Sequence, residues 1–220
     1  MTASRAPARP APPPVRQAEH QPVYHERASS YNRDTGIFQP FRRAVVEALP
    51  LRHGQVVLDV GCGTGLCFGS LREKVGPSGT VIGIEKSPEM AALAREHIAH
   101  EGWHNVTVML SSAEDARLEA IADAALFCAV HDILQSPGAL RNVMTRLSPG
   151  AWVTAGGGKW ASPIMVTVNS MVRMLHASYV RSFSGFDRPW CHLGQLVEDV
   201  RVREMAFGTG YVMTGRKPAL

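Results

Sequence analysis

The sequence predicts a single α/β domain built on a mostly parallel sheet with helices on both faces. Short apolar, valine-rich segments alternate with segments of helical periodicity over residues 38–157, and the connections between them are short. Such alternation is typical of parallel strands joined by crossover helices, which form a doubly wound sheet. Two further short strands around Gly208-Thr209-Gly210 predict that an antiparallel hairpin closes the sheet at its C-terminal end.

The individual elements follow from local signals. The run Val56–Val60 is almost wholly apolar and ends at glycines, as a buried parallel strand does. Ser87 is a favourable N-cap and Pro88 suits the first position of a helix, so a helix begins there. On similar grounds we expect strands at residues 56–60, 80–85, 105–110, 124–130 and 151–156. Helices are expected at residues 38–49, 66–75, 87–100 and 137–147.

The alternation stops after Gly158. We expect a methionine-rich amphipathic helix over residues 164–180, a loop over 182–190 and a second helix over 192–200. The strands of the closing hairpin are expected at residues 202–207 and 211–215.

The composition fits a folded domain that follows a tail. Of the 220 residues, 45% are hydrophobic, which is enough to bury a core. Residues 1–22 are rich in proline and alanine, so we expect a disordered tail there and a folded domain over residues 23–220. The net charge is +4, and three arginines against one glutamate in the tail account for half of it. The remaining surplus is too small and too scattered to indicate nucleic-acid binding.

The cysteines and the apolar runs indicate a cytoplasmic protein. None of the four cysteines lies in a CxxC pair, and no cysteine–histidine spacing matches a zinc site, so we expect reduced thiols and no metal. The chain has no signal-peptide pattern and no apolar run of the roughly 18–20 residues that a transmembrane helix needs. We therefore expect no transmembrane segment.

The most informative segment is VVLDVGCGTGL, residues 56–66. A strand leads into Gly61, Gly63 and Gly65, and a helix follows directly, so the backbone can turn sharply and approach a ligand. Asp59 precedes this glycine loop, and Glu85 ends the next strand about 20 residues later, where an acidic side chain can bind the ribose hydroxyls of an adenine nucleoside.

The spacing of the glycines separates two cofactors that both carry adenosine. The dinucleotide fingerprint GxGxxG requires glycine at position 66, where this chain has Leu66. No Walker-type Lys-Ser/Thr pair follows the loop either. The loop therefore favours S-adenosylmethionine over a dinucleotide, with Asp59 facing the cationic end of the ligand.

The segments VVLDVGCGTGL and VIGIEKSPEM resemble the cofactor-binding motifs of class I S-adenosylmethionine-dependent methyltransferases. The resemblance covers residues 38–157, the final GTGYVMTGRK is similar to the terminal hairpin of that family, and the implied fold is Rossmann-like. It implies that Glu85 binds the ribose and that Lys86 and Met90 lie near the adenine. Many relatives have aspartate where this chain has Ser112, which leaves the contact to the adenine amino group open. The full set of implied cofactor-binding residues is Asp59, Gly61, Cys62, Gly63, Gly65, Glu85, Lys86, Met90, Ala113, Glu114 and Ala129.

Three residues are candidates for a catalytic role. AALFCAVHDIL resembles the fourth-strand motif of the family, and His131 follows that strand at the sheet edge where ligands collect. It can act as a general base on a hydroxyl, it can orient a carboxylate, or it can only cap the strand end. Tyr24 and Tyr31 precede the first helix, and by resemblance they lie in a segment that folds over the cofactor, where aromatic faces attract a sulfonium. Ordinary packing of that segment is the alternative.

Residues 159–199 are expected to form a lid over the acceptor. Met165, Met171, Met174 and Tyr179 recur at near-helical spacing, and methionine adapts to irregular apolar ligands. The segment therefore favours an apolar or aromatic acceptor. A plain core helix and a surface for lipid head groups, suggested by Arg173, His176 and Arg181, are the alternatives.

The sequence thus predicts a metal-independent enzyme that methylates a small biosynthetic molecule on oxygen or nitrogen. Phospholipid N-methylation, quinone C-methylation and a non-catalytic, cofactor-binding regulatory role are the alternatives. The expected partner is the small-molecule acceptor, with peripheral lipid contact left open, and the expected state is a monomer or homodimer.

Overall fold

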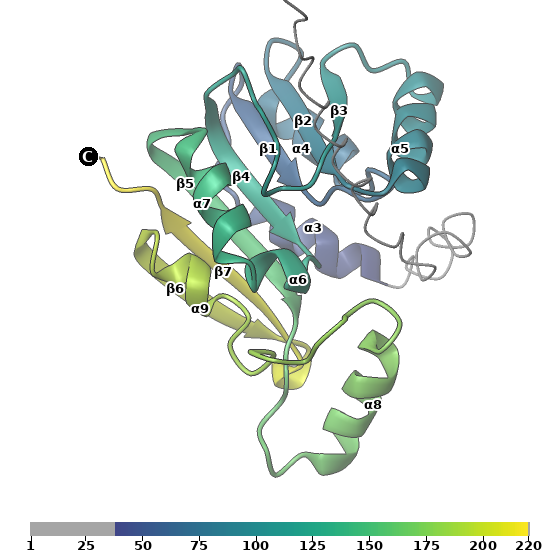
Figure 1. The fold of residues 1–220 in the computed structure, drawn as a ribbon, viewed down its shortest axis with the longest axis vertical. Coiled ribbons are helices and arrows are strands. Elements are labelled where there is room, and N and C mark those ends of the chain that lie inside the picture. The colour runs from purple at the N-terminus through teal and green to yellow at the C-terminus, as the bar shows by residue number, and fades with distance from the viewer. Residues whose placement is uncertain (1–37, 220) are drawn as a thin grey trace, which may run out of the picture.

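The computed structural model describes residues 38–219 and contains one seven-stranded sheet (Figure 1). The strand order is β3-β2-β1-β4-β5-β7-β6. The strands are β1 (Val56–Val60), β2 (Thr80–Glu85), β3 (Val106–Leu110), β4 (Ala122–Cys128), β5 (Leu147–Gly158), β6 (Glu198–Met205) and β7 (Gly210–Arg216). The first five strands pair in parallel, and β7 runs antiparallel to both β5 and β6. The predicted fold class is confirmed.

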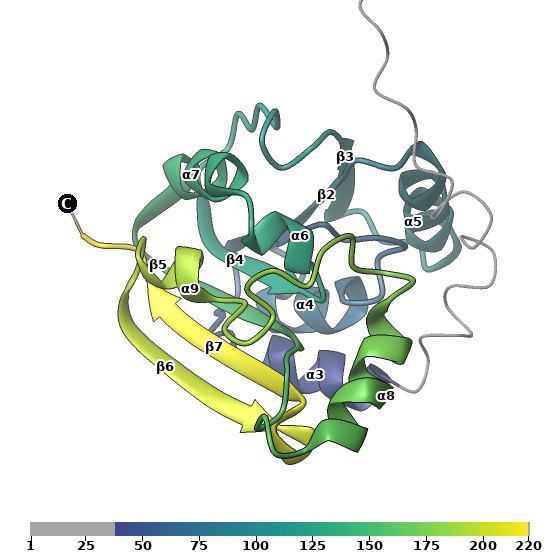
Figure 2. The ribbon, with the colours of Figure 1, turned by 60° about the horizontal axis from the view of Figure 1, so that its bottom comes forward.

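Helices cover both faces of the sheet. The helices are α3 (Gln39–Glu47), α4 (Phe68–Val75), α5 (Pro88–His100), α6 (His131–Leu134), α7 (Pro137–Thr145), α8 (Val166–His176) and α9 (Cys191–Gly194). In the view of Figure 2, α3 and α4 lie on one side of the sheet, and α6, α7 and α9 lie on the other. A 3-10 turn, η2 (Ala206–Gly208), joins β6 to β7.

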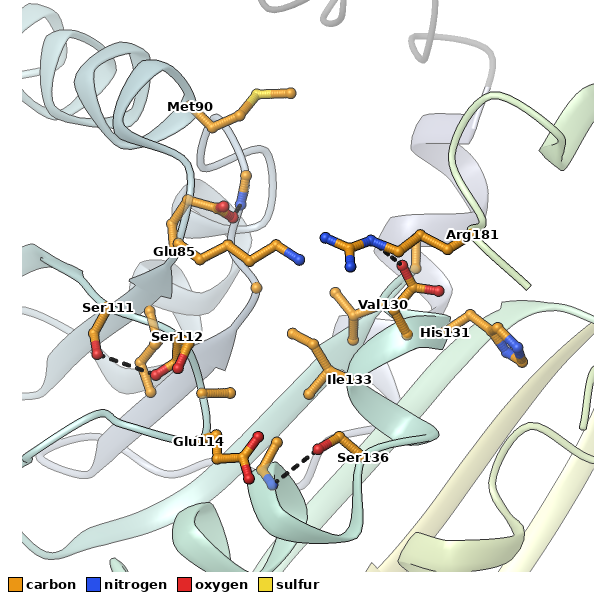
Figure 3. A pocket seen from close by; sticks show the side chains of 18 of the residues that line it. Glu85, Met90, Ser111, Ser112, Glu114, Val130, His131, Ile133, Ser136 and Arg181 are labelled. Atoms are coloured by element: carbon orange, nitrogen blue, oxygen red, sulfur yellow. Dashed lines mark hydrogen bonds and ion pairs between the residues drawn. The ribbon is translucent and has the colours of Figure 1, made fainter. Parts of the chain in front are cut away.

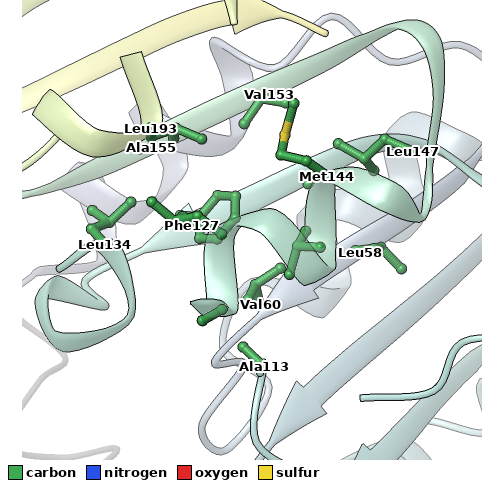
Figure 4. Close-up of a cluster of buried hydrophobic side chains, with 14 of the residues drawn as sticks. Leu58, Val60, Ala113, Phe127, Leu134, Met144, Leu147, Val153, Ala155 and Leu193 are labelled. Atoms are coloured by element: carbon green, nitrogen blue, oxygen red, sulfur yellow. The ribbon is translucent and has the colours of Figure 1, made fainter. Parts of the chain in front are cut away.

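Each face of the sheet has its own apolar core. Phe127 of β4 and Val153 of β5 pack with Met144 of α7 and Leu193 of α9 on one face (Figure 4). On the other face Phe68 of α4 joins a second cluster that also contains residues of α3 and α5. The central strands are buried from both sides, which is why their sequences are nearly continuous apolar runs.

Most predicted elements are confirmed with small shifts of their ends. The strands β1 and β2 have the predicted bounds, and the side chain of Ser87 accepts a hydrogen bond from the backbone N–H of Met90 as the N-cap of α5. The helix predicted over residues 192–200 is wrong. Helix α9 spans four residues and the chain then enters β6, whose Glu198 pairs with Arg216 of β7. Val197 and Val200 suit a strand better than a helix because their branched side chains fit a pleated sheet.

Residues 159–197, between the end of β5 and the start of β6, form a segment that we call the insertion. It contains α8, which lies at the edge of the molecule in both views (Figures 1 and 2). The backbone N–H of Trp160 donates to the carbonyl of Phe186 at 3.0 Å, so the two ends of the stretch between them are joined. No helix within residues 38–219 is long and apolar enough to cross a membrane.

The methionines of the insertion do not face the interior. Met174 is 71% exposed and Met171 is 56% exposed, while Val172 is the buried residue of α8. The predicted apolar wall of methionines over the acceptor stays a prediction. The amphipathic pattern of the helix is real, but the helix turns Val172 toward the protein and leaves the methionine face outside.

Candidate active site

A cavity of about 350 Å³ lies at the carboxyl ends of β1, β2 and β4. In an open parallel sheet this edge is where ligands bind, since the loops after the strands diverge there. The volume is within the range of small-molecule pockets, roughly 300–1,000 Å³. Figure 3 shows Glu85 and Met90 on one side of the opening and Val130, Ile133 and Arg181 on the other.

The glycine loop forms the floor of the cavity, and its three glycines are required for two different reasons. All three have positive φ, at 74° for Gly61, 56° for Gly63 and 82° for Gly65. A Cβ on Gly61 would lie 2.6 Å from Val130, and one on Gly65 would lie 2.4 Å from the ring of Phe68. A Cβ on Gly63 would meet nothing within 4 Å. Gly61 and Gly65 thus allow close packing, whereas Gly63, which lines the cavity, leaves room for a ligand.

Glu85 fixes the loop to the end of β2. Its Oε2 accepts a hydrogen bond from the backbone N–H of Gly63 at 3.0 Å, and its Oε1 accepts one from the N–H of Ser87 at 2.8 Å. Each carboxylate oxygen has a second lone pair, so Glu85 can still accept hydrogen bonds from a ligand in the cavity that it lines.

Asp59, at the end of β1, lies beneath the cavity rather than on its surface. Its side chain is 2% exposed, and its Oδ2 has no hydrogen-bond partner among residues 38–219. Burial, with the nearby charge of Glu85, raises the pKa of this carboxyl to about 7. A buried hydrogen-bond acceptor without a partner is unfavourable, and a cationic ligand would supply the missing partner.

The end of β4 turns sharply into the cavity wall. Ala129 adopts a left-handed backbone with φ of 58°, and its N–H donates to the carbonyl of Gly156 at 2.7 Å. This conformation is strained for alanine, and strained residues concentrate at functional sites. The turn places Val130 and the short helix α6, with His131 and Asp132, at the opening.

His131 is held by the insertion. Its Nε2 lies 3.0 Å from the carbonyl oxygen of Ser184, and its ring packs edge-on to Phe186 at 5.0 Å. Because a carbonyl only accepts, Nε2 carries the proton, and Nδ1 is left buried with no partner in the described part of the chain. Burial lowers the pKa of His131, so its imidazole is neutral near pH 7. In Figure 3 the ring points away from the side on which Glu85 lies.

The structure brings together most of the residues expected to contact the cofactor. Nine expected residues line the cavity: Gly61, Gly63, Glu85, Lys86, Met90, Ala113, Glu114, Ala129 and His131. Asp59, Cys62 and Gly65 do not line it, and burial raises the pKa of the Cys62 thiol. Tyr24 and Tyr31, like the tail over residues 1–22, lie outside the described residues. Sequence reasoning missed the pocket role of Arg181, which follows α8.

The residues present fit S-adenosylmethionine. Asp59 offers a cationic group a buried carboxyl whose Oδ2 has no partner in the described chain, Gly63 leaves room, and Glu85 presents acceptor oxygens for ribose hydroxyls. Within residues 38–219 no group of three histidine, cysteine, aspartate or glutamate side chains is placed to hold a metal ion.

Comparison with known proteins agrees with this geometry. Residues 51–160, half of the chain, match the family described as a methyltransferase domain. The chain belongs to the class I methyltransferase family. S-adenosylmethionine is its cofactor, and the resemblance seen in the sequence is confirmed.

Individual relatives of this methyltransferase match over shorter stretches. Aklanonic acid methyltransferase DauC of Streptomyces sp. (strain C5) is 36% identical over 93 residues, 42% of each chain. A protein-L-isoaspartate O-methyltransferase of Ignicoccus hospitalis is 47% identical over 66 residues, 30% of this chain and 31% of that protein. The match thus spans less than half of either curated relative. A crystal structure of a SAM-dependent methyltransferase from Aquifex aeolicus has a TM-score of 0.62 at 18% identity, over 87% of this chain and 97% of that one, which shows a shared fold.

Proposed function

We propose that this methyltransferase transfers the methyl group of S-adenosylmethionine to an oxygen or nitrogen of a small organic molecule. The observation that carries the proposal is the Oδ2 of Asp59, a buried carboxyl oxygen with no partner among residues 38–219, beneath a cavity that Glu85 and the glycine loop line. S-adenosylmethionine supplies a methyl group that is already activated by its sulfonium. The protein therefore has to align the acceptor and exclude water, and positioning of this kind can supply about 7–11 kcal/mol of the barrier.

The acceptor side of the cavity supports a small molecule. Val130 and Ile133 provide an apolar wall, and Tyr179 and Arg181 of the insertion line the opening. In this proposal the insertion acts as the lid, and for an alcohol acceptor the ring of His131 has to turn toward the cavity (Figure 3) before its buried Nδ1 can accept the proton. The relative from Streptomyces, named for an organic acid, supports the same class of acceptor. A cytoplasmic location is part of the proposal and is supported by four free cysteines.

One observation favours a second candidate, methylation of a lipid-borne acceptor. Ile164, Val166 and Met174 of the insertion are 70% or more exposed and offer an apolar surface to a bilayer. Sedimentation with phospholipid vesicles separates the two candidates, since only a lipid enzyme is expected to be carried into the pellet.

Calorimetric titration with S-adenosylmethionine tests the main proposal. The wild type is expected to bind, and Asp59→Ala and Glu85→Ala are each expected to weaken binding by roughly tenfold to a hundredfold, because each removes a charged partner. Glu96→Ala, an exposed glutamate of α5, is the matched control. Absence of binding by the wild type overturns the proposal. Binding without transfer of labelled methyl to any acceptor in a broad metabolite panel supports the regulatory alternative instead.

A further inference from the structure

Among the described residues of the insertion, the cavity lining includes only Tyr179 and Arg181. The side chain of Arg181 comes from the loop that follows α8, and in Figure 3 its guanidinium extends over the opening toward the side on which Glu85 lies. Within residues 38–219, the Arg181 side chain forms an ion pair with Asp132 of α6, whose Oδ2 lies 3.8 Å from the Nε of Arg181. A cation from the insertion and an anion from the sheet edge therefore meet at the mouth of the site.

This ion pair is loose. A separation of 3.8 Å is longer than a hydrogen bond, so Asp132 uses none of the five N–H donors of the guanidinium through this contact. The Arg181 side chain is 52% exposed and that of Asp132 is 28% exposed. A pair this exposed contributes about 0–1 kcal/mol. An anion that matches the planar guanidinium with two parallel hydrogen bonds would replace it at little cost.

The surroundings of Arg181 suit a molecule with an apolar body and one anionic group. Val130 and Ile133 flank the opening and carry no charge. His131 is neutral because burial lowers its pKa, and its Nε2 is already bonded to Ser184. The other cation of the cavity lining, Lys86, follows Glu85 directly and so belongs to the cofactor side. On the acceptor side, within residues 38–219, Arg181 is thus the positive charge that lines the cavity.

We propose that Arg181 recognises a carboxylate on the acceptor and exchanges Asp132 for it, so that the acceptor is an organic acid with an apolar body. This inference rests on the proposed function, since it names the class of molecule that binds beside the cofactor. Before the acceptor binds, the guanidinium is paired only loosely, with Asp132 at the opening. The carboxylate of the cofactor's own methionine group is the other possible source of the same chemistry, and the test distinguishes the two sources.

The first measurement is calorimetric binding of S-adenosylhomocysteine to the wild type, Arg181→Gln and the control Arg188→Gln, an exposed arginine of the same loop. All three are expected to bind with affinities within about twofold of one another, which also shows that the variants are folded. A loss of roughly tenfold in Arg181→Gln alone means that Arg181 holds the cofactor carboxylate, and this result overturns the proposal. If the wild type itself does not bind, the proposed function fails first.

The second measurement is ligand-observed NMR on the S-adenosylhomocysteine complex with pairs of aromatic acids and their primary amides. Benzoic, 2-naphthoic and anthraquinone-2-carboxylic acids are the probes. The wild type and Arg188→Gln are expected to prefer acids by roughly tenfold, and Arg181→Gln is expected to lose this preference. Arg181→Lys is expected to retain part of the preference, because lysine keeps the charge but cannot donate two parallel hydrogen bonds from a planar group. Asp132→Asn is expected to bind acids more tightly, because the competing carboxylate is gone. Equal binding of acids and amides, a preference that survives in Arg181→Gln, or no binding of any acid overturns the proposal.

Discussion

Replacement of Asp59 by asparagine tests the electrostatic basis of the site. The buried Asp59 carboxyl has its pKa raised from 3.8 to about 7, because burial disfavours its charge and Glu85 adds to the effect. Between these two values the folded protein without cofactor binds more protons than the unfolded chain. Its free energy of unfolding therefore falls as pH rises from about 4 to about 7. Asparagine has nearly the same shape as the neutral acid and does not titrate.

The magnitude follows from the shift. Each unit of pKa shift corresponds to 1.36 kcal/mol. Of the interval between the unfolded and folded pKa values of Asp59, about two pH units lie above pH 5, so its ionisation lowers the free energy of unfolding by about 3 kcal/mol between pH 5 and pH 8.5. At about 2–4 °C per kcal/mol for a domain of this size, the difference in Tm between Asp59→Asn and the wild type should grow by about 6–12 °C over that range. The contributions of the other titrating groups cancel in this Tm difference because both proteins carry them.

The assay is thermal unfolding of both proteins at the two pH values, with and without S-adenosylmethionine. Asp187→Asn, at an exposed aspartate, is the control and should behave as the wild type does. A cationic ligand beside Asp59 lowers the pKa of its carboxyl, so saturating cofactor should stabilise the wild type more at pH 8.5 than at pH 5. A Tm difference that is the same at pH 5 and pH 8.5 would refute the argument.

Three further predictions concern separate parts of the structure. Gly63→Ala should lower the free energy of unfolding by about 1–2 kcal/mol, because alanine is strained in a left-handed backbone, and should abolish cofactor binding in calorimetry. Gly61→Ala should destabilise the fold further, because its Cβ overlaps the side chain of Val130. Lys74→Met should lower the free energy of unfolding by about 1–3 kcal/mol in urea titrations, since the Nζ of Lys74 donates to three carbonyls at the C-terminal end of α3. Burial lowers the pKa of both His131 and His176, so contacts of the insertion should weaken as pH falls below 6.5, with faster amide exchange over residues 166–190.

Each of these expectations has a result that would contradict it. Unchanged cofactor affinity in Gly63→Ala would mean that the ligand does not approach the loop there. For Lys74, a loss no larger than that of Arg43→Met, at an exposed cation of α3, would show that the carbonyl contacts contribute nothing specific. Equal amide exchange rates over the insertion at pH 5.5 and pH 7.5 would show that protonation of the two histidines does not weaken its contacts.

The cofactor half of the site was largely predictable because local sequence determines it. The strand before Gly61, the N-cap at Ser87 and the acidic end of β2 are signals that lie within a few residues of the atoms they place. Parallel pairing of β1 with β2 then brings the glycine loop and Glu85 together without any further information. The role of Asp59 beneath the cavity rather than in it depends on the depth of packing, which the motif does not encode.

The acceptor half was less predictable because long-range packing determines it. Periodicity showed that α8 has an apolar face, but not that Met174 would lie outside and Val172 inside. The contact between Asp132 and Arg181 joins residues 49 apart on two elements whose relation no local pattern gives. The helix expected over residues 192–200 failed for a similar reason, since pairing with β7 at the sheet edge decides the conformation there.

The joined ends of the insertion bear on how such enzymes can diversify. Because Trp160 and Phe186 are hydrogen-bonded to each other, the stretch between them starts and finishes at neighbouring points, two residues after β5 and before α9. A replacement of different length would still start and finish at the same two residues, and doubling its length costs only about 0.6 kcal/mol of closure entropy. Selection or engineering can therefore replace this stretch as a unit while the strands that carry the glycine loop stay unchanged.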